Sequence, residues 1–159
     1  MSETSGLSTD HAAVTVPPPL IYVAFFVVGV GLQLYLPLGR LPIGIGRVVG
    51  AGLVLSGLVL SAWSVRRFWA AGTSVLPVRP TTALVIEGPY RWTRNPMYLA
   101  LLLMYIGAAL WFALVWPLLL APVLVVVMNV SVICREERYL TRKFGGEYRH
   151  YQTQVRRWL

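Results

Sequence analysis

The sequence predicts an all-α membrane protein with four transmembrane helices, the last two of which form a tight hairpin, and an amphipathic helix at the cytoplasmic surface. Three observations support this fold class. The chain is 57% hydrophobic and 13% charged, whereas an ordinary soluble domain carries about 25% charged residues. Four apolar stretches have the length needed to cross a hydrocarbon core of roughly 30 Å. A charged segment with regularly spaced aromatic residues follows the last of them.

The first half of the chain has the composition of a scaffold. Residues 1–16 are polar and small, and we expect a disordered tail. Residues 17–79 hold two predicted spans with their connections, one over about residues 20–36 and one over about residues 43–63. Gln33 is polar inside the first span, where we expect it to form an interhelical hydrogen bond or to lie at the interface.

The second predicted span contains small residues at helical spacing. They are Gly46, Gly50, Gly52, Ser56 and Gly57. Small side chains allow two helices to approach closely in a membrane. We therefore interpret them as packing positions; they are not a dinucleotide fingerprint, because no strand precedes them and the required spacing is missing.

Residues 80–159 form the predicted cofactor-binding catalytic half, which consists of a polar loop, a transmembrane hairpin and an amphipathic tail. Asn95-Pro96 predicts a helix start, because asparagine can cap free amide groups and proline suits the first helical position. The predicted third span runs from there to about Phe112. Basic and aromatic residues crowd this helix N-terminus, which favours an anionic ligand group; they are Tyr90, Arg91, Trp92, Arg94 and Tyr98.

A second polar cluster, residues 135–139, follows the predicted fourth span over about residues 116–133. Because the third and fourth spans fold back on each other, both clusters should lie at the same membrane face. We therefore expect Tyr98 and Glu136 to share one cavity. The aromatic spacing of the tail predicts an amphipathic helix along the membrane surface, broken at Gly145-Gly146.

The charge distribution predicts an orientation. With four spans, twelve Lys and Arg residues share one side with the N-terminus, the polar loop and the C-terminal tail, and two lie on the other. This excess places the N-terminus, loop and tail in the cytoplasm. The net charge of +8 is then explained by contact with anionic lipid headgroups, and nucleic-acid binding is not needed to explain it. We expect a monomer or a weak homo-oligomer.

The two polar clusters together resemble a known family. The run from Gly88 to Tyr98 reads GPYRWTRNPMY, and after two apolar spans come Glu136-Glu137, residues 144–148 with the sequence FGGEY, and Tyr151. This pattern, over about residues 80–159, resembles the isoprenylcysteine carboxyl methyltransferases and the related phospholipid methyltransferases. The resemblance implies an integral membrane enzyme that binds S-adenosylmethionine between the two motifs and takes a lipophilic acceptor from the bilayer.

Carried over by position, the resemblance implies a set of cofactor contacts. They are Thr82, Ala83, Leu84, Val85, Tyr90, Asn95, Pro96, Met97, Tyr98 and Glu136. We place catalytic roles on Arg94, Asn95 and Tyr98. Two positions depart from the family pattern. Asn95 replaces a histidine and cannot exchange a proton near neutral pH, and Val132 replaces an arginine that prenylcysteine enzymes use for the substrate carboxylate, which argues against that substrate.

The chemistry of these residues suits the cofactor independently of the resemblance. Arg94 or the helix N-terminus can bind a carboxylate, and Glu136 can accept hydrogen bonds from ribose hydroxyls or an ammonium group. Tyr90, Trp92 or Tyr98 can stack on adenine or face a sulfonium. No metal constellation is present, and the single cysteine, Cys134, excludes an intramolecular disulfide and a multi-cysteine metal site.

The sequence thus predicts a membrane methyltransferase that uses S-adenosylmethionine on a lipid-like acceptor, whether carboxylate, thiol or amine. The absence of histidine from both clusters suits the first two types better, because a protonated amine must lose a proton first. One alternative is an NADPH-dependent membrane reductase of the steroid 5-alpha-reductase type. A nonenzymatic four-helix membrane protein is the other, and it is disfavoured because the spans contain few polar groups beyond Gln33 and Asn129.

Overall fold

The computed structural model describes residues 16–39, 41–73 and 81–159, and in this part of the chain every regular element is helical. The elements are α1 (Pro18–Tyr35), α2 (Ile43–Ala70), the 3₁₀ turn η1 (Gly88–Arg91), α3 (Pro96–Trp111), α4 (Val115–Met128), the π-helical turn η2 (Asn129–Ile133), α5 (Cys134–Phe144) and α6 (Gly146–Gln154). The predicted disordered tail, apart from Val16, lies outside the described residues.

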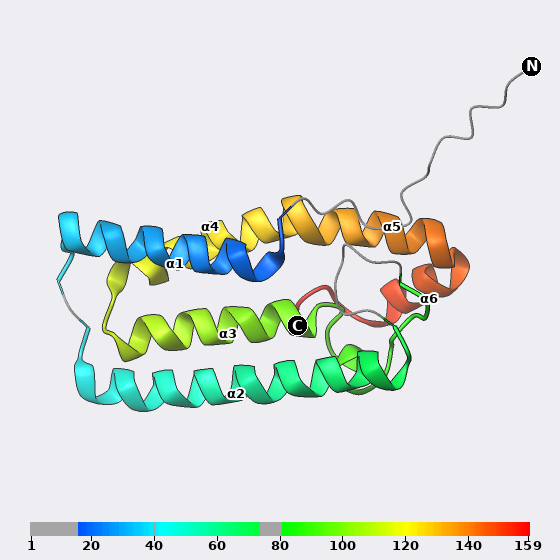
Figure 1. Ribbon diagram of the computed structural model, residues 1–159, viewed down its shortest axis with the longest axis horizontal. Helices are drawn as coiled ribbons and strands as arrows, with labels where there is room; N and C mark the ends of the chain where they lie inside the picture. Colours follow the sequence, from blue (N-terminus) through cyan, green and yellow to red (C-terminus); the bar gives the residue numbers. More distant parts are fainter. Residues whose placement is uncertain (1–15, 40, 74–80) are drawn as a thin grey trace, which may run out of the picture.

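Three helical runs in the described part are long and apolar enough to cross a membrane: α1, α2 and the run Val115–Phe144. The shorter apolar helix α3 lies among them. Figure 1 shows α1 beside α4 and α2 beside α3, with α5 continuing the line of α4. The end of α2, the start of α3, α5 and α6 therefore gather at one end of the bundle. We call this the polar end, and the opposite end the apolar end.

Glycines set the close approach of α2 and α3. A Cβ added to Gly50 would lie 2.6 Å from the Gly107 carbonyl oxygen, and one added to Gly57 would lie 2.7 Å from the Ala100 carbonyl oxygen. Backbone atoms cannot move aside as a flexible side chain can, so a side chain at either position would separate the helices. The packing interpretation is confirmed for these two glycines. It is wrong for Gly52, where a Cβ would meet no atom within 4 Å.

Gln33 joins α1 to the start of α4. Its Oε1 accepts hydrogen bonds from the backbone N–H groups of Val115 and Trp116, at 3.1 and 3.3 Å. Its Nε2 donates to the carbonyl oxygen of Gly39 at 3.1 Å. The residue before α4, Leu114, has no side chain that can cap a helix. The predicted interhelical hydrogen bond of Gln33 is confirmed, and it serves as a cap supplied by another helix.

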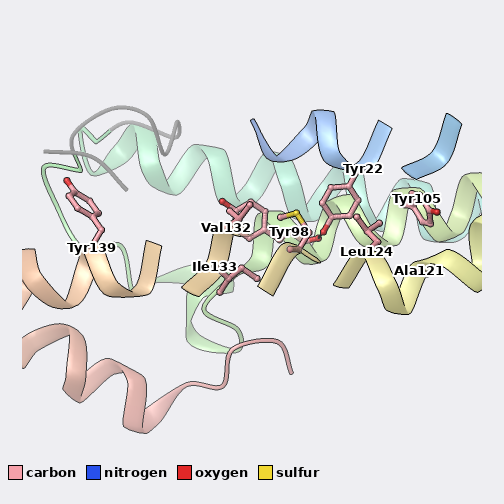
Figure 2. Packing of buried hydrophobic residues seen from close by; sticks show 9 residues of the cluster. Tyr22, Tyr98, Tyr105, Ala121, Leu124, Val132, Ile133 and Tyr139 are labelled. Carbon is pink, nitrogen blue, oxygen red and sulfur yellow. Dashed lines mark hydrogen bonds between the residues drawn. The ribbon is translucent and has the colours of Figure 1, made fainter. Parts of the chain in front are cut away.

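Tyrosines and aliphatic residues form the core between α1, α3 and α4 (Figure 2). Leu124 is fully buried, and Tyr22 and Tyr105 are nearly so. The Tyr22 hydroxyl donates to the Tyr98 carbonyl oxygen, and the Tyr105 hydroxyl donates to the Pro117 carbonyl oxygen, each at 2.9 Å. Each phenol thus fills apolar space while its hydroxyl is satisfied by backbone, as burial of a polar group requires.

Two predicted helix ends are wrong. Helix α2 does not end near Trp63 but continues through Arg66 and Arg67 to Ala70, because no residue before Gly72 breaks it. The fourth helix does not end at Ile133, since η2 leads directly into α5. The predicted break at Gly145 is confirmed: its φ of 53° is a conformation that glycine adopts without a Cβ penalty, and α6 begins after it.

Candidate functional site

A pocket at the polar end is formed by the loop before α3, the first turn of α3, and α5 and α6. Its empty space is about 820 Å³, including the part open to solvent. It is lined by Phe68, Thr81, Ala83, Leu84, Val85, Tyr90, Arg94, Asn95, Pro96, Met97, Tyr98, Glu136, Glu137, Tyr139, Leu140, Tyr148 and Tyr151. The cavity volume proper is about 110 Å³, below the roughly 300–1,000 Å³ of typical small-molecule sites, so the pocket is identified by its lining residues and not by its size.

Tyr98 and Glu136 meet in this pocket. Tyr98 lies in the first turn of α3 and Glu136 in the first turn of α5. The hairpin of α3 and α4 brings the two turns together, and the Tyr98 hydroxyl donates to Glu136 Oε1 at 2.6 Å. The prediction that these two residues share one cavity is confirmed. A hydrogen bond to a carboxylate of this length is of the strong, charge-assisted kind, and it fixes the direction of the carboxylate.

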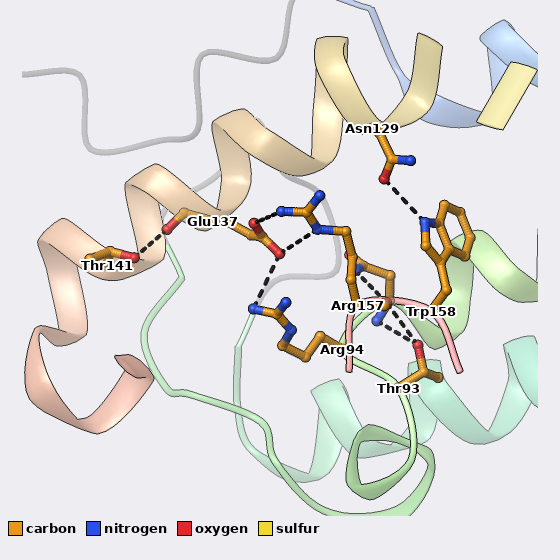
Figure 3. A network of polar contacts seen from close by, with 8 residues as sticks. Thr93, Arg94, Asn129, Glu137, Thr141, Arg157 and Trp158 are labelled. Carbon is orange, nitrogen blue, oxygen red and sulfur yellow. Dashed lines mark hydrogen bonds and ion pairs between the residues drawn. The ribbon is translucent and has the colours of Figure 1, made fainter. Parts of the chain in front are cut away.

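Glu137 lies between two arginines (Figure 3). Arg157 binds it with two prongs: Nε to Oε1 at 3.0 Å and Nη2 to Oε2 at 2.6 Å. Arg94 makes a single, longer contact, from Nη1 to Oε1 at 3.3 Å. The side chains of Arg94 and Glu137 are each only 12% exposed. The Glu137 hydrogen bonds raise the pKa of Arg157 above its ordinary value, which keeps this guanidinium charged at all accessible pH values.

The C-terminal residues, far away in sequence, bind the loop before α3. The backbone N–H of Arg94 donates to the Arg156 carbonyl oxygen at 3.0 Å. The Arg157 carbonyl oxygen accepts from Thr93 Oγ1 at 3.0 Å and from Asn95 Nδ2 at 2.9 Å. The Asn95 side chain donates in this way through Nδ2, and its Oδ1 makes no capping bond to α3. The predicted helix start at Pro96 is confirmed, but the predicted cap by Asn95 is wrong.

Five tyrosines line the pocket: Tyr90, Tyr98, Tyr139, Tyr148 and Tyr151. The Tyr151 hydroxyl donates to the Tyr90 carbonyl oxygen at 2.6 Å, which ties α6 to η1. Burial raises the pKa of Tyr148 to about 12, and it raises the pKa values of Tyr90 and Tyr151 well above the ordinary range. These phenols therefore remain neutral near pH 7 and present aromatic faces to a ligand.

Two buried polar atoms of the pocket have no hydrogen-bond partner among the described residues. They are the Tyr90 hydroxyl and Nε of Arg94. Leaving such a group unpaired costs about 1–3 kcal/mol, so proteins rarely do so without a reason. Both belong to side chains that line the pocket. Their positions identify two places where a ligand can supply the missing acceptor.

The pocket collects most of the residues that the sequence singled out. The ones that line it are Ala83, Leu84, Val85, Tyr90, Arg94, Asn95, Pro96, Met97, Tyr98 and Glu136. Thr82 does not: its N–H donates to Thr73 Oγ1 at 2.9 Å and its hydroxyl to the Gly72 carbonyl oxygen at 3.2 Å. Trp92 also lies outside, 65% exposed and packed edge-on against Trp63.

Sequence reasoning missed several residues of the site. Tyr139, Leu140, Tyr148 and Tyr151 line the pocket, as do Phe68 and Thr81. The regular aromatic spacing of the tail was a signal for the tyrosines, but it was interpreted as a membrane-facing stripe. Arg157 could not be singled out from the sequence, because it stands next to Arg156, a residue of the same type in the same charged tail. In the described part of the chain, no group of three or more His, Cys, Asp or Glu side chains could hold a metal ion.

The fold and the site define a helical membrane protein with a polar, tyrosine-lined pocket at one end. Comparison with known sequences adds the family. The chain belongs to the phospholipid methyltransferase family, whose sequence model matches residues 45–147. This match confirms the family predicted from the two polar clusters, and it points to methyltransferase activity in a membrane.

The chain is also 48% identical over 65 residues to an uncharacterized protein of Haemophilus influenzae. The match covers 40% of this chain and the whole of that protein. No solved structure matches the chain.

Proposed function

We propose that the protein transfers a methyl group from S-adenosylmethionine to a lipophilic or lipid-like acceptor that it takes from the bilayer. The observation that carries the proposal is the Tyr98–Glu136 hydrogen bond of 2.6 Å, which joins the start of α3 to the start of α5 across one pocket. The buried, unpaired Nε of Arg94 in the same pocket supports it. Family membership gives the reaction class.

The donor and acceptor groups of the pocket match the polar groups of S-adenosylmethionine. Arg94 presents a buried N–H that suits the carboxylate of the ligand. The α3 N-terminus has no side-chain cap, so its first amide groups also suit an anion. Glu136 can accept hydrogen bonds from the ammonium group or from ribose hydroxyls. The tyrosine faces suit the adenine ring and the positive sulfur.

S-adenosylmethionine supplies an already activated methyl group, so the protein's task is to align the acceptor with it and to exclude water. Tyr98 and Asn95 are held rigidly, by Glu136 and by the Arg157 carbonyl oxygen respectively, and they can position the reacting groups. A carboxylate or thiolate acceptor needs no base. For a protonated amine, Glu136 is the pocket carboxylate that can accept the proton before methyl transfer.

We further propose that the apolar helices α1, α2, α3 and α4 cross the membrane with the polar end in the cytoplasm. The antiparallel arrangement of α1 to α4 supports this topology. So does the excess of twelve basic residues on the side of the polar end over two on the other side. At 16 residues α3 spans about 24 Å, less than the roughly 30 Å hydrocarbon core, so we expect its polar start to lie at or just below the headgroup region. The acceptor then reaches the pocket from the inner leaflet.

A methyl-transfer assay tests the proposal. Purified protein is incubated with methyl-labelled S-adenosylmethionine and membrane extract of the host, and the labelled product is identified. We expect label in a lipophilic product, and about 100-fold slower labelling with the Glu136→Ala variant. If the wild type transfers no label but oxidises NADPH in the presence of the same extract, the protein is a reductase and the proposal is wrong.

A further inference from the structure

We infer that Arg157 is a positioning residue: by occupying both carboxylate oxygens of Glu137, it keeps the Arg94 guanidinium available for an anionic group of the ligand. The inference rests on the proposed function, because it takes the carboxylate of S-adenosylmethionine as that group. It concerns a residue two positions from the C-terminus that does not line the pocket. Arg157 therefore acts through Glu137 and Arg94.

The geometry shows unequal sharing of Glu137. Arg157 makes the two-pronged pair, at 3.0 and 2.6 Å, whereas Arg94 makes one contact at 3.3 Å through Nη1. Two-pronged pairs are the strongest arrangement of guanidinium and carboxylate. With Arg157 in the two-pronged position, Arg94 reaches only Oε1 and does so through Nη1 alone, and among the described residues its buried Nε has no partner. Without Arg157, Glu137 would be free to bind Arg94 with both oxygens.

The charges of Glu137, Arg94 and Arg157 also indicate that Arg157 keeps Arg94 available for an anionic ligand group. Glu137 and its two arginines carry a net charge of +1, and Arg94 and Glu137 are each only 12% exposed, so water screens them weakly. Removing the Arg157 charge would leave Arg94 and Glu137 as a neutral pair beside the pocket. An anionic ligand group would then be attracted less, and it would have to compete with Glu137 for the same N–H groups.

The backbone holds Arg157 where this role requires it. Its carbonyl oxygen accepts from Thr93 and Asn95, which flank Arg94 in sequence. On the next residue, Trp158 Nε1 donates to Asn129 Oδ1 in η2 at 3.1 Å. Figure 3 shows these bonds to the right of Glu137, beside its pairs with the two arginines. The same short segment thus fixes both the loop that carries Arg94 and the guanidinium that competes for Glu137.

Four variants test the inference by calorimetric titration with S-adenosylmethionine and by steady-state kinetics. Arg157→Gln should raise Kd and KM for S-adenosylmethionine by about tenfold or more, because a charge-assisted bond is weakened, while kcat at saturation changes little. Arg157→Lys, which keeps the charge but not the two-pronged geometry, should fall between wild type and Arg157→Gln. Arg149→Gln is the matched control: it removes the same charge from an exposed position on α6, and affinity should not change.

The decisive variant is the double substitution Glu137→Gln with Arg157→Gln. It removes the competing carboxylate together with Arg157, so Arg94 regains an uncompensated charge and affinity should recover toward the wild-type value. If Arg157 merely stabilised the fold, a second substitution in the same network would not restore binding. Affinity of the double variant equal to or weaker than that of Arg157→Gln would therefore overturn the inference.

A readout without ligand separates this inference from the proposed function. In protein labelled with ¹⁵N-arginine, the Nε resonance of Arg94 should shift in Arg157→Gln and in Arg157→Lys, and should stay unchanged in Arg149→Gln. An unchanged Arg94 resonance in folded Arg157→Gln or Arg157→Lys would overturn the positioning role. Absence of S-adenosylmethionine binding by the wild type would instead overturn the proposed function, and the resonance would still test the positioning.

Discussion

The two ends of the bundle treat their polar groups differently. At the apolar end, Gln33 caps α4 and the Tyr105 hydroxyl binds a backbone carbonyl oxygen. At the polar end, the Tyr90 hydroxyl and Arg94 Nε are buried and have no partner within residues 16–39, 41–73 and 81–159. Both ends belong to the same packed helices, so the difference is not one of packing quality. Among the described residues, the polar groups at the apolar end are satisfied by the protein, whereas two buried polar atoms at the polar end are not.

The difference between the two ends suggests two groups of residues: those that hold the helices together and those that are available to bind a ligand. Substitutions at the apolar end should reduce the free energy of unfolding and leave ligand affinity per folded molecule unchanged. Substitutions at the polar end should do the reverse. The four predictions below test this separation, from the largest expected effect to the smallest.

Gly50→Val should have the largest effect, on stability. A Cβ at Gly50 would lie 2.6 Å from the Gly107 carbonyl oxygen, and overpacking against rigid backbone costs about 3 kcal/mol or more. We expect a lower thermal unfolding midpoint and a lower yield in detergent. Gly52→Val is the matched control on the same helix, because a Cβ at Gly52 meets no atom within 4 Å. Equal loss of stability in both variants would contradict the described α2–α3 contact.

Glu136→Ala should lower kcat/KM for S-adenosylmethionine by about 100-fold, since a hydrogen-bonded charge in a pocket contributes up to about 3 kcal/mol. Its unfolding midpoint should fall less than that of Gly50→Val, because only the hydrogen bond between the starts of α3 and α5 is lost. The control is Glu147→Ala, which removes the same charge from an exposed position on α6. A Glu136→Ala variant with unchanged kinetics would show that the pocket has been misplaced.

Tyr98→Phe should weaken S-adenosylmethionine binding by about tenfold, as only the hydroxyl that orients Glu136 is lost. The aromatic ring remains, so the packing of α3 against α1 should be preserved. Calorimetric titration measures the effect, and Tyr35→Phe, at an 87% exposed residue, is the control. A loss as large as that of Glu136→Ala would mean that the Tyr98 hydroxyl itself touches the ligand.

Gln33→Ala should have the smallest effect, a loss of about 1 kcal/mol of unfolding free energy, which is typical for removal of a helix cap. The backbone N–H groups of Val115 and Trp116 lose their acceptor. Thermal unfolding in detergent measures the change, and S-adenosylmethionine affinity should remain that of the wild type. A drop in affinity without a drop in stability would break the separation of the two ends.

The sequence predicted the scaffold well where the signal was local. Apolar length identified the helices, and Asn95-Pro96 marked the start of α3. Helix ends were less predictable, since α2 continues past its arginines and η2 joins α4 to α5 without a break. Neither arginine nor a π-turn stops a helix by itself, so composition could not reveal these continuations.

The part of the site formed by the two sequence motifs was predictable. The part formed by contacts between the C-terminal segment and the loop before α3 was not. Tyr98 and Glu136 could be paired because the hairpin between them is short. Arg157 could not, because its partners Thr93, Asn95 and Glu137 are 20 to 64 positions away in the chain. The role of the Asn95 side chain was equally unpredictable: its Nδ2 donates to the distant Arg157 carbonyl oxygen, which the local sequence does not reveal, and it makes no capping bond.

Calorimetric titration of the purified wild-type protein with S-adenosylmethionine, and separately with NADPH, tests the central claim most directly. We expect saturable binding of S-adenosylmethionine that Glu136→Ala weakens by about 100-fold and Glu147→Ala leaves intact, with no binding of NADPH. Binding of NADPH without binding of S-adenosylmethionine would contradict the account.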